Sequence, residues 1–196
     1  MSINPKELEE KLDLRVQRTR SLILEAFTSL IAEKRFESIS VQDVADRARI
    51  NRVTFYDHFP DKYALLDYAV SYTFEQEIEK RMLNACEYTP ENFRNLVLAV
   101  CSYISQMQSD CAQPLQHFES LMEGTIKKRL FELLSHWLEQ LKSPLPVELP
   151  ATVTTWAIYG LAVFYAHQKK HPPLEKFVNE ALPLVSVGLE QFVKPA

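Results

Sequence analysis

The fold of this chain is decided by residues 39–62, which read ISVQDVADRARINRVTFYDHFPDK. Two short helices are predicted within this stretch, and each follows a residue that caps a helix N-terminus. Ser40 precedes the first helix, with Asp43 three positions later as the second half of a capping box. Asn51 caps the second helix after a short connection. Two short capped helices joined in this way predict a helix-turn-helix over residues 38–59.

The second helix of this pair has an inward side and an open side. Phe55 and Phe59 lie one turn apart and are expected to point into a core. The residues expected on the open side are mostly polar: Arg52, Val53, Thr54, Tyr56, Asp57 and His58. A short helix with one exposed polar face fits the major groove of DNA. This stretch therefore predicts a DNA-recognition helix.

The side chains on the open side suit the groups that DNA presents. Arg52 can donate two hydrogen bonds to the O6 and N7 atoms of guanine. Val53 and Thr54 suit a thymine methyl group or a phosphate, and Tyr56 and His58 can hold backbone phosphates. One alternative is an aromatic cluster that only closes a three-helix unit. For Arg52, the alternative is a plain solvated charge.

Residues 50–62, with the run Ala-Leu-Leu at 64–66, resemble the recognition helix of the TetR family of bacterial repressors. The family pattern is a Ser- or Asn-capped helix that ends in Tyr-x-His-Phe, followed by a short turn and a Lys. Residues 39–45 resemble the preceding helix of the family, and the resemblance covers about residues 15–75. The DNA-binding residues predicted on this basis are Ser40, Asn51, Arg52, Val53, Thr54, Tyr56, His58 and Lys62, the last as a phosphate contact.

Three positions depart from the family pattern. Arg49 stands in the turn where the family often has Gly, and a non-Gly residue in a left-handed turn costs about 1 kcal/mol. Val53 replaces a small residue, which indicates a changed base preference. Asp57 is acidic on the DNA-facing side, where it repels phosphate unless it accepts from a cytosine amine or pairs with an arginine.

The remaining chain also has helical patterning, so the predicted fold class is all-α with about nine helices. A short helical extension is predicted over residues 1–14, with Asn4 as cap and Pro5 in the first helical position. A helix-turn-helix DNA-binding domain is predicted over residues 15–75. The resemblance implies that residues 76–196 form a helical domain for ligand binding and dimerisation.

Aromatic and methionine side chains recur along the middle of the chain. Such side chains can line an adaptable apolar pocket, although each one is also compatible with an ordinary core. The predicted pocket residues are Phe74, Phe93, Tyr103, Met107, Phe118, Met122, Trp137, Trp156 and Tyr159. Glu119 and Glu123 are interpreted as part of a solvated helix face, with contact to a cationic ligand as the alternative.

The last two predicted helices, about 151–168 and 174–193, have broad apolar faces. Pairing them with a second copy as a four-helix bundle would cover these faces and match two DNA half-sites. A core within one chain is the alternative. The predicted interface residues are Ile158, Leu161, Tyr165, Phe177, Ala181, Leu182, Val185 and Leu189.

Charge is distributed unevenly along the chain. The 196 residues carry a net charge of −4, yet residues 14–62 hold nine basic and seven acidic side chains. This segment is therefore net positive, which favours the N-terminal part as the DNA-binding end. Only three glycines occur, and there is no catalytic motif or metal-ligand spacing. No enzymatic activity, cofactor or metal is predicted.

No segment reaches the roughly 18 uncharged apolar residues that a membrane span needs. The N-terminus also has no basic segment followed by an apolar core, so a cytoplasmic location without a membrane partner is expected. Cys86, Cys101 and Cys111 form no CxxC pair. They are interpreted as reduced, buried thiols, with redox sensing as the alternative.

These features together predict a homodimeric transcription repressor that binds double-stranded DNA at a palindromic operator. A small apolar or amphipathic ligand is expected to release it from DNA. The alternatives are an activator or a ligand-independent DNA-binding factor of the same fold, and a helical interaction module without DNA binding.

Overall fold

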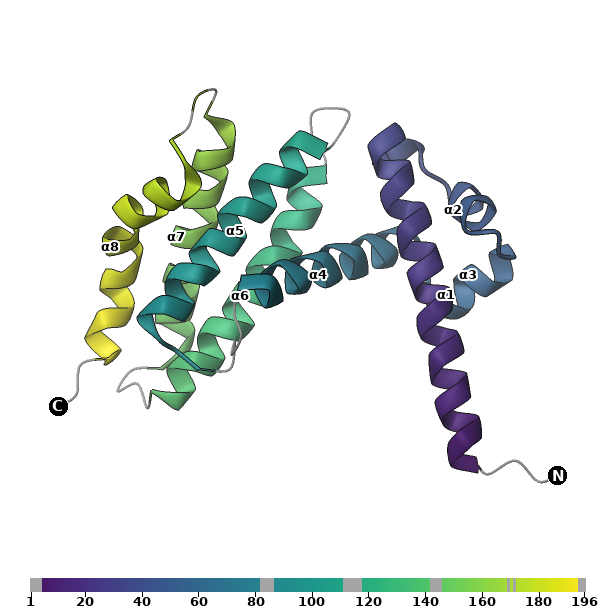
Figure 1. The fold of residues 1–196 in the computed structure, drawn as a ribbon, viewed down its shortest axis with the longest axis horizontal. Coiled ribbons are helices and arrows are strands. Elements are labelled where there is room, and N and C mark those ends of the chain that lie inside the picture. The colour runs from purple at the N-terminus through teal and green to yellow at the C-terminus, as the bar shows by residue number, and fades with distance from the viewer. Residues whose placement is uncertain are drawn as a thin grey trace. The chain divides into compact units, whose positions relative to one another are not determined.

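The computed structural model describes residues 5–81, 87–110, 118–141, 146–168, 170 and 172–193, and every regular element among them is helical (Figure 1). The elements are α1 (Pro5–Glu33), the 3-10 helix η1 (Phe36–Ser38), α2 (Val41–Ala48), α3 (Arg52–His58), α4 (Lys62–Arg81), α5 (Pro90–Asp110), α6 (Phe118–Gln140), α7 (Glu148–His167) and α8 (Leu174–Val193). The predicted all-α fold class is confirmed.

Helix α1 is longer than the sequence pattern suggests. A short helical extension over residues 1–14 is predicted to precede the DNA-binding domain, but α1 runs without interruption from Pro5 to Glu33. Its sequence contains no Gly and no further Pro, so nothing in the backbone stops the helix between these ends. The described residues accordingly form eight α-helices and one 3-10 helix, where about nine helices are expected.

The chain divides into two compact units, and the division falls inside α4, between Ala69 and Val70. The boundary predicted from the sequence, after residue 75, lies in the same helix. We refer to the part before this division as the N-terminal unit and to the part after it as the C-terminal unit.

The N-terminal unit is built on α1, which packs against α2 and α3. Its core consists of apolar side chains that are nearly or fully buried, among them Ile23, Phe27, Leu30, Phe36, Ile39, Val44, Phe55 and Leu65. Burial of each large side chain contributes about 1.5–3 kcal/mol. The core therefore holds the two short helices, which are too short to be stable alone.

The C-terminal unit is arranged around α7, which packs against α5, α6 and α8 (Figure 1). Helix α5 also packs against α8. Cys101 on α5 is fully buried, and this burial raises the pKa of its thiol to about 12. That thiol is therefore protonated and unreactive at neutral pH, whereas Cys86 and Cys111 lie outside the described residues.

Helix α7 is the one described helix that is long and apolar enough to cross a membrane by length and composition. Buried residues make up 39% of its most apolar window. In this structure three other helices pack around it, as they do around a core helix of a globular unit.

Candidate nucleic-acid interface

The N-terminus of α2 is held by the predicted capping box. The Ser40 Oγ accepts a hydrogen bond from the Asp43 backbone N–H at 3.1 Å. The Asp43 carboxylate accepts in return from the Ser40 backbone N–H at 2.7 Å and from its hydroxyl at 2.6 Å. Lys34 lies 2.9 Å from the same carboxylate. Hydrogen bonds from Ser40, followed by Lys34, hold the pKa of Asp43 well below its usual range.

The turn between α2 and α3 keeps left-handed geometry despite its arginine. Arg49 has φ 55° and ψ 43° and is the one non-glycine residue with positive φ among the described residues. Its backbone N–H is directed at the carbonyls of Ala45 and Asp46, and the next N–H, of Ile50, donates to Ala45 at 3.0 Å. These hydrogen bonds offset a strain of about 1 kcal/mol, so the turn has the geometry of a glycine turn.

Helix α3 is anchored by its two phenylalanines. Phe55 is fully buried and Phe59 is 4% exposed, and their ring centroids lie 5.9 Å apart. The Asn51 side-chain oxygen accepts from the Val53 N–H at 2.9 Å, which completes the predicted N-cap. The inward side predicted for α3 is therefore present in the structure.

The open side of α3 carries an arginine paired with a tyrosine. The Arg52 guanidinium donates to the Tyr56 hydroxyl at 2.9 Å and lies 5.4 Å from the centre of its ring. Arg52 is exposed, as are Val53 and Asp57, and Tyr56 is 45% exposed. Since the helix turn sets their spacing, Arg52 and Tyr56 present their donors as one group that faces solvent.

His58 sits at the C-terminal end of α3 and is half-buried. Burial, followed by the nearby positive charge of Arg20, lowers its pKa, while Asp57 acts in the opposite direction. The neutral imidazole keeps one N–H donor, which is sufficient for a phosphate contact. Arg20 on α1 is a further basic group near α3 that the sequence pattern did not single out.

Lys62, predicted as a phosphate contact, makes hydrogen bonds within the N-terminal unit, and the phosphate contact stays a prediction. Its Nζ donates to the backbone carbonyls of Phe36, Glu37 and Ile39 at 3.1, 3.0 and 2.9 Å. Three acceptors account for the three N–H donors of an ammonium group. The Nζ also lies 4.7 Å from the ring centre of Phe36. Lys62 therefore ties the first turn of α4 to η1 and braces the N-terminal unit.

A second brace joins α1 to α2. Arg47 donates to both carboxylate oxygens of Glu33 at 2.8 and 2.7 Å and to the Ser29 hydroxyl at 2.6 Å. The hydrogen bond from Arg47 lowers the pKa of Glu33. The sequence pattern missed this contact because the partners are 14 and 18 positions apart and carry no motif.

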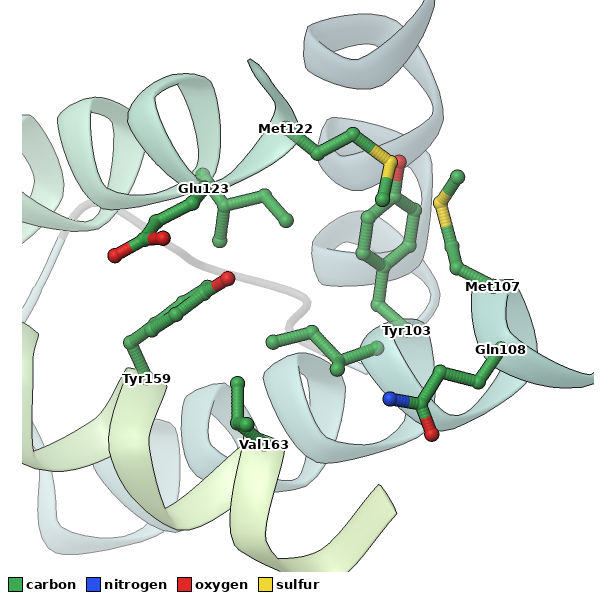
Figure 2. Close-up of a pocket in the computed structure, with 9 residues that line it drawn as sticks. Tyr103, Met107, Gln108, Met122, Glu123, Tyr159 and Val163 are labelled. Carbon is green, nitrogen blue, oxygen red and sulfur yellow. The ribbon is translucent and has the colours of Figure 1, made fainter. Parts of the chain in front are cut away.

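The C-terminal unit contains a cavity of about 120 Å³, shown in Figure 2. The residues that line it come from α5, α6 and α7: Tyr103, Ile104, Met107, Gln108, Met122, Glu123, Ile126, Tyr159 and Val163. Tyr103, Met107, Met122 and Tyr159 belong to the predicted pocket set. Glu123, predicted on a solvated face, also lines the cavity.

The other predicted pocket residues lie elsewhere. Phe74, Phe93 and Trp137 lie in the core and are at most 1% exposed. Trp156 is 59% exposed. Phe118, like Glu119, lies in a stretch whose side chains the structure does not describe. Among the described residues, no group of three or more His, Cys, Asp or Glu could hold a metal ion.

Most of the predicted dimer-interface residues are core residues of a single chain. Those that are buried are Ile158, Tyr165, Phe177, Ala181, Val185 and Leu189, while Leu161 and Leu182 are half-buried. They are covered because α7 and α8 pack on each other and on α5. The apolar residues that α7 and α8 expose instead are Leu149, Val153, Trp156, Phe164 and Leu184.

Comparison with known proteins agrees with this geometry. The family model described as "Bacterial regulatory proteins, tetR family" matches residues 23–69. The uncharacterized HTH-type transcriptional regulator YxbF of Bacillus subtilis (strain 168) is 25% identical over 189 residues, which is 93% of this chain. The chain spans only about half of that relative, since the match covers 48% of its length.

Two solved structures share the fold over most of their length. The dihydroxyacetone kinase operon activator DhaS superposes with a TM-score of 0.58 at 21% identity, covering 89% of this chain and 96% of that chain. The regulator FadR from Bacillus subtilis in complex with stearoyl-CoA has a TM-score of 0.55 at 18% identity, covering 86% and 98%. At sequence identities this low, the similarity shows that the fold is shared and nothing further.

The capped pair α2 and α3, with its left-handed turn and exposed polar face, defines a helix-turn-helix unit of the kind found in DNA-binding regulators. Residues 23–69 match the TetR family of bacterial regulatory proteins, and most of the chain shares its fold with solved transcription regulators.

Proposed function

We propose that this protein is a cytoplasmic, homodimeric transcription regulator that inserts α3 of each copy into a DNA major groove. The exposed face of α3 carries the proposal: Arg52, Val53 and Tyr56 face solvent while Phe55 is fully buried. The capping residues Ser40 and Asn51, the turn at Arg49 and the hydrogen bonds of Lys62 hold α3 at a fixed position in the N-terminal unit.

Within this proposal, the residues of the open face have separate roles. Arg52 leads the helix and reads a base edge, with guanine as the expected partner. Val53 and Thr54 contact a thymine methyl group or a phosphate, and Tyr56 and His58 hold phosphates. Since Tyr56 already accepts a hydrogen bond from Arg52, it also orients the guanidinium before DNA binds.

Ser40 and Asn51 act first as helix caps in this arrangement. Each side-chain oxygen already accepts a backbone N–H of its own helix. Their contribution to DNA binding is therefore the position of α2 and α3, and any phosphate contact they make is additional.

A second copy of the chain covers the exposed apolar face of α7 and α8 in the proposed dimer. Leu149, Val153 and Phe164 are each more than half exposed on α7, and their spacing places them on one side of the helix. Gly160 lies on the same side, where an added Cβ would meet nothing within 4 Å, so another helix can approach closely. The stacked contact of Phe164 with Phe177 extends this face to α8, where Leu184 is 80% exposed.

Ligand response is proposed to start at the cavity of the C-terminal unit. Tyr103, which lines it, has its hydroxyl 2.7 Å from the Thr73 hydroxyl and 3.3 Å from the Val70 carbonyl. Both partners belong to α4, and Val70 follows the division between the two units. A ligand that displaces Tyr103 acts on α4 and so favours one of two arrangements of the dimer, provided that it binds them with different affinity.

The decisive experiment is selection of binding sites from random double-stranded DNA, followed by salt titration of the best site. An enriched palindrome is expected, with log affinity falling against log salt by about 0.9 per contacted phosphate. Arg52→Ala should lose discrimination at one base pair, worth about 1–3 kcal/mol. Arg129→Ala in the C-terminal unit is the matched control. Absence of an enriched site together with a flat salt response contradicts the proposal and favours a helical interaction module.

The sign of regulation is a separate question, because the solved relative DhaS is an operon activator. A reporter gene placed behind the selected site measures it directly. We expect repression, seen as lower reporter output when the regulator is expressed, and higher output on activation would reverse this part of the proposal.

A further inference from the structure

The cavity of the C-terminal unit has one carboxylate in its wall. Glu123 is the one charged residue among the described residues that line it. Figure 2 shows Glu123 and Tyr159 on one side of the cavity and Tyr103 and Met107 on the opposite side. The rest of the described wall is apolar apart from Gln108 and the hydroxyls of Tyr103 and Tyr159. A carboxylate in an otherwise uncharged wall disfavours anionic ligands.

Glu123 has a cationic partner just outside the cavity wall. It forms an ion pair with Lys127, one turn further along α6. The Lys127 Nζ lies 3.1 Å from the ring centre of Trp156 and 5.2 Å from that of Tyr159. The Lys127 side chain is only 14% exposed, so its ammonium is held between a carboxylate and two aromatic rings. We call Glu123, Trp156 and Tyr159 the ammonium cage.

The composition of this cage matches the recognition of organic cations. Aromatic faces attract ammonium groups and are the usual surroundings of quaternary ammonium ligands in proteins. Two of the three cage residues, Glu123 and Tyr159, also line the cavity. A ligand whose charged group occupies the cage can therefore place its apolar part in the cavity.

We propose that the cavity binds a small organic ammonium ion whose charged group displaces the Lys127 ammonium from the cage. This inference rests on the proposed ligand response and names the chemical class of the ligand. Lysine ammonium is strongly hydrated and sits on a flexible stem, so it can move into water when displaced. A quaternary ammonium is hydrated less and leaves water for aromatic faces more readily. Lys127 thereby competes with the ligand for the ammonium cage, and this competition raises the ligand concentration at which the cage is filled.

The size of the cavity limits the ligand. Its volume of about 120 Å³ is close to the roughly 150 Å³ of an engineered cavity that holds benzene. A ligand with a few carbon atoms beside its charged group fits this space. The long acyl thioester named for the FadR complex exceeds this volume and carries negative charge.

Isothermal titration of the full-length protein with choline and with its neutral isostere 3,3-dimethylbutan-1-ol tests the proposal. The two probes have the same shape and differ in the charged nitrogen. We expect choline to bind at least about tenfold more tightly, as a cation–π and carboxylate site would predict. Equal binding of the two probes, or absence of choline binding, overturns the proposal.

Three variants separate the cage from general effects on folding. Glu123→Gln should weaken choline binding about tenfold and leave the isostere unchanged. Lys127→Met should strengthen choline binding by a similar factor, because the competing ammonium is gone; a destabilised protein would not gain affinity. Lys128→Met, at an exposed neighbouring position of α6, is the control and should bind as the wild type does. A Lys127→Met protein that binds choline no better than wild type contradicts displacement.

The same preparations distinguish this inference from the proposed function. Selected, salt-dependent DNA binding without any preference for choline means that the ligand class is wrong and the regulator stands. Choline binding in a protein that selects no DNA site means that the cage is right and the regulator function fails.

Discussion

Two lysines in different units of the chain have similar surroundings and different partners. Lys62 lies over the rings of Phe36 and Tyr63, and Lys127 lies over those of Trp156 and Tyr159. Lys62 donates to three backbone carbonyls, whereas Lys127 pairs with one side-chain carboxylate beside a cavity.

The difference between the partners decides what each lysine can do. The carbonyls of Phe36 and Ile39 are part-buried where Lys62 reaches them, so removal of Lys62 takes away a charged donor that water replaces poorly. The Glu123 side chain is 36% exposed and can be solvated or accept another cation. Lys62 therefore stabilises the fold of the N-terminal unit. Lys127 occupies the ammonium cage of the C-terminal unit and can be replaced there by another cation.

The largest expected effect is on stability. Lys62→Met should lower the free energy of unfolding of the N-terminal unit by about 3 kcal/mol, because carbonyl acceptors of a charged donor lose their partner. Lys127→Met should lower stability by less than about 1 kcal/mol, as is usual for an ion pair within reach of water. Chemical denaturation followed by circular dichroism measures both. If the two variants lose similar free energy of unfolding, the proposed difference between Lys62 and Lys127 is wrong.

The same pair also tests the reassignment of Lys62. If Lys62 braces the fold, the salt dependence of DNA binding by folded Lys62→Met keeps the wild-type slope. A phosphate contact by Lys62 would instead reduce that slope by about 0.9. A reduced slope would restore the contact predicted from the sequence.

The next effect concerns the surface proposed for dimerisation. Phe164→Asp places a charge on the exposed face of α7 and should weaken association by about a hundredfold, since a buried unpaired carboxylate is costly. Light scattering should then show the protomer mass of 22.7 kDa at concentrations where the wild type is a dimer. Lys128→Asp, at an exposed position of α6, is the control. Unchanged association of Phe164→Asp would point to a different interface.

The features that could be predicted from the sequence are those with local causes. The caps at Ser40 and Asn51 and the inward Phe55 follow from the spacing of neighbouring residues. The roles of Lys62 and Arg47 depend on partners far along the chain, so no local pattern indicates them. The sequence pattern predicts that α7 has broad apolar faces. It does not indicate which face stays exposed, because that depends on where α5, α6 and α8 pack.

A smaller effect is expected at the capping box. Ser40→Ala should cost about 1 kcal/mol through loss of the cap. Because the folded pKa of Asp43 lies below its ordinary value of 3.8, its contribution to stability is complete above about pH 4 and is lost as the pH falls through the folded pKa. The stability difference between wild type and Asp43→Asn should therefore shrink in acid. A difference that stays constant down to the lowest accessible pH argues against an ionised Asp43 as the cause.

The smallest effect belongs to His58 and has opposite signs for folding and for DNA binding. Its folded pKa lies below the ordinary 6.5, so its contribution to stability is present above that pH and is lost as the pH falls through the folded value. A DNA phosphate favours the imidazolium, so DNA affinity should rise over the same range. His58→Gln should remove both trends, and His136→Gln on α6 should remove neither. Loss of the stability trend alone would mean that His58 is a packing residue at the end of α3 and makes no phosphate contact.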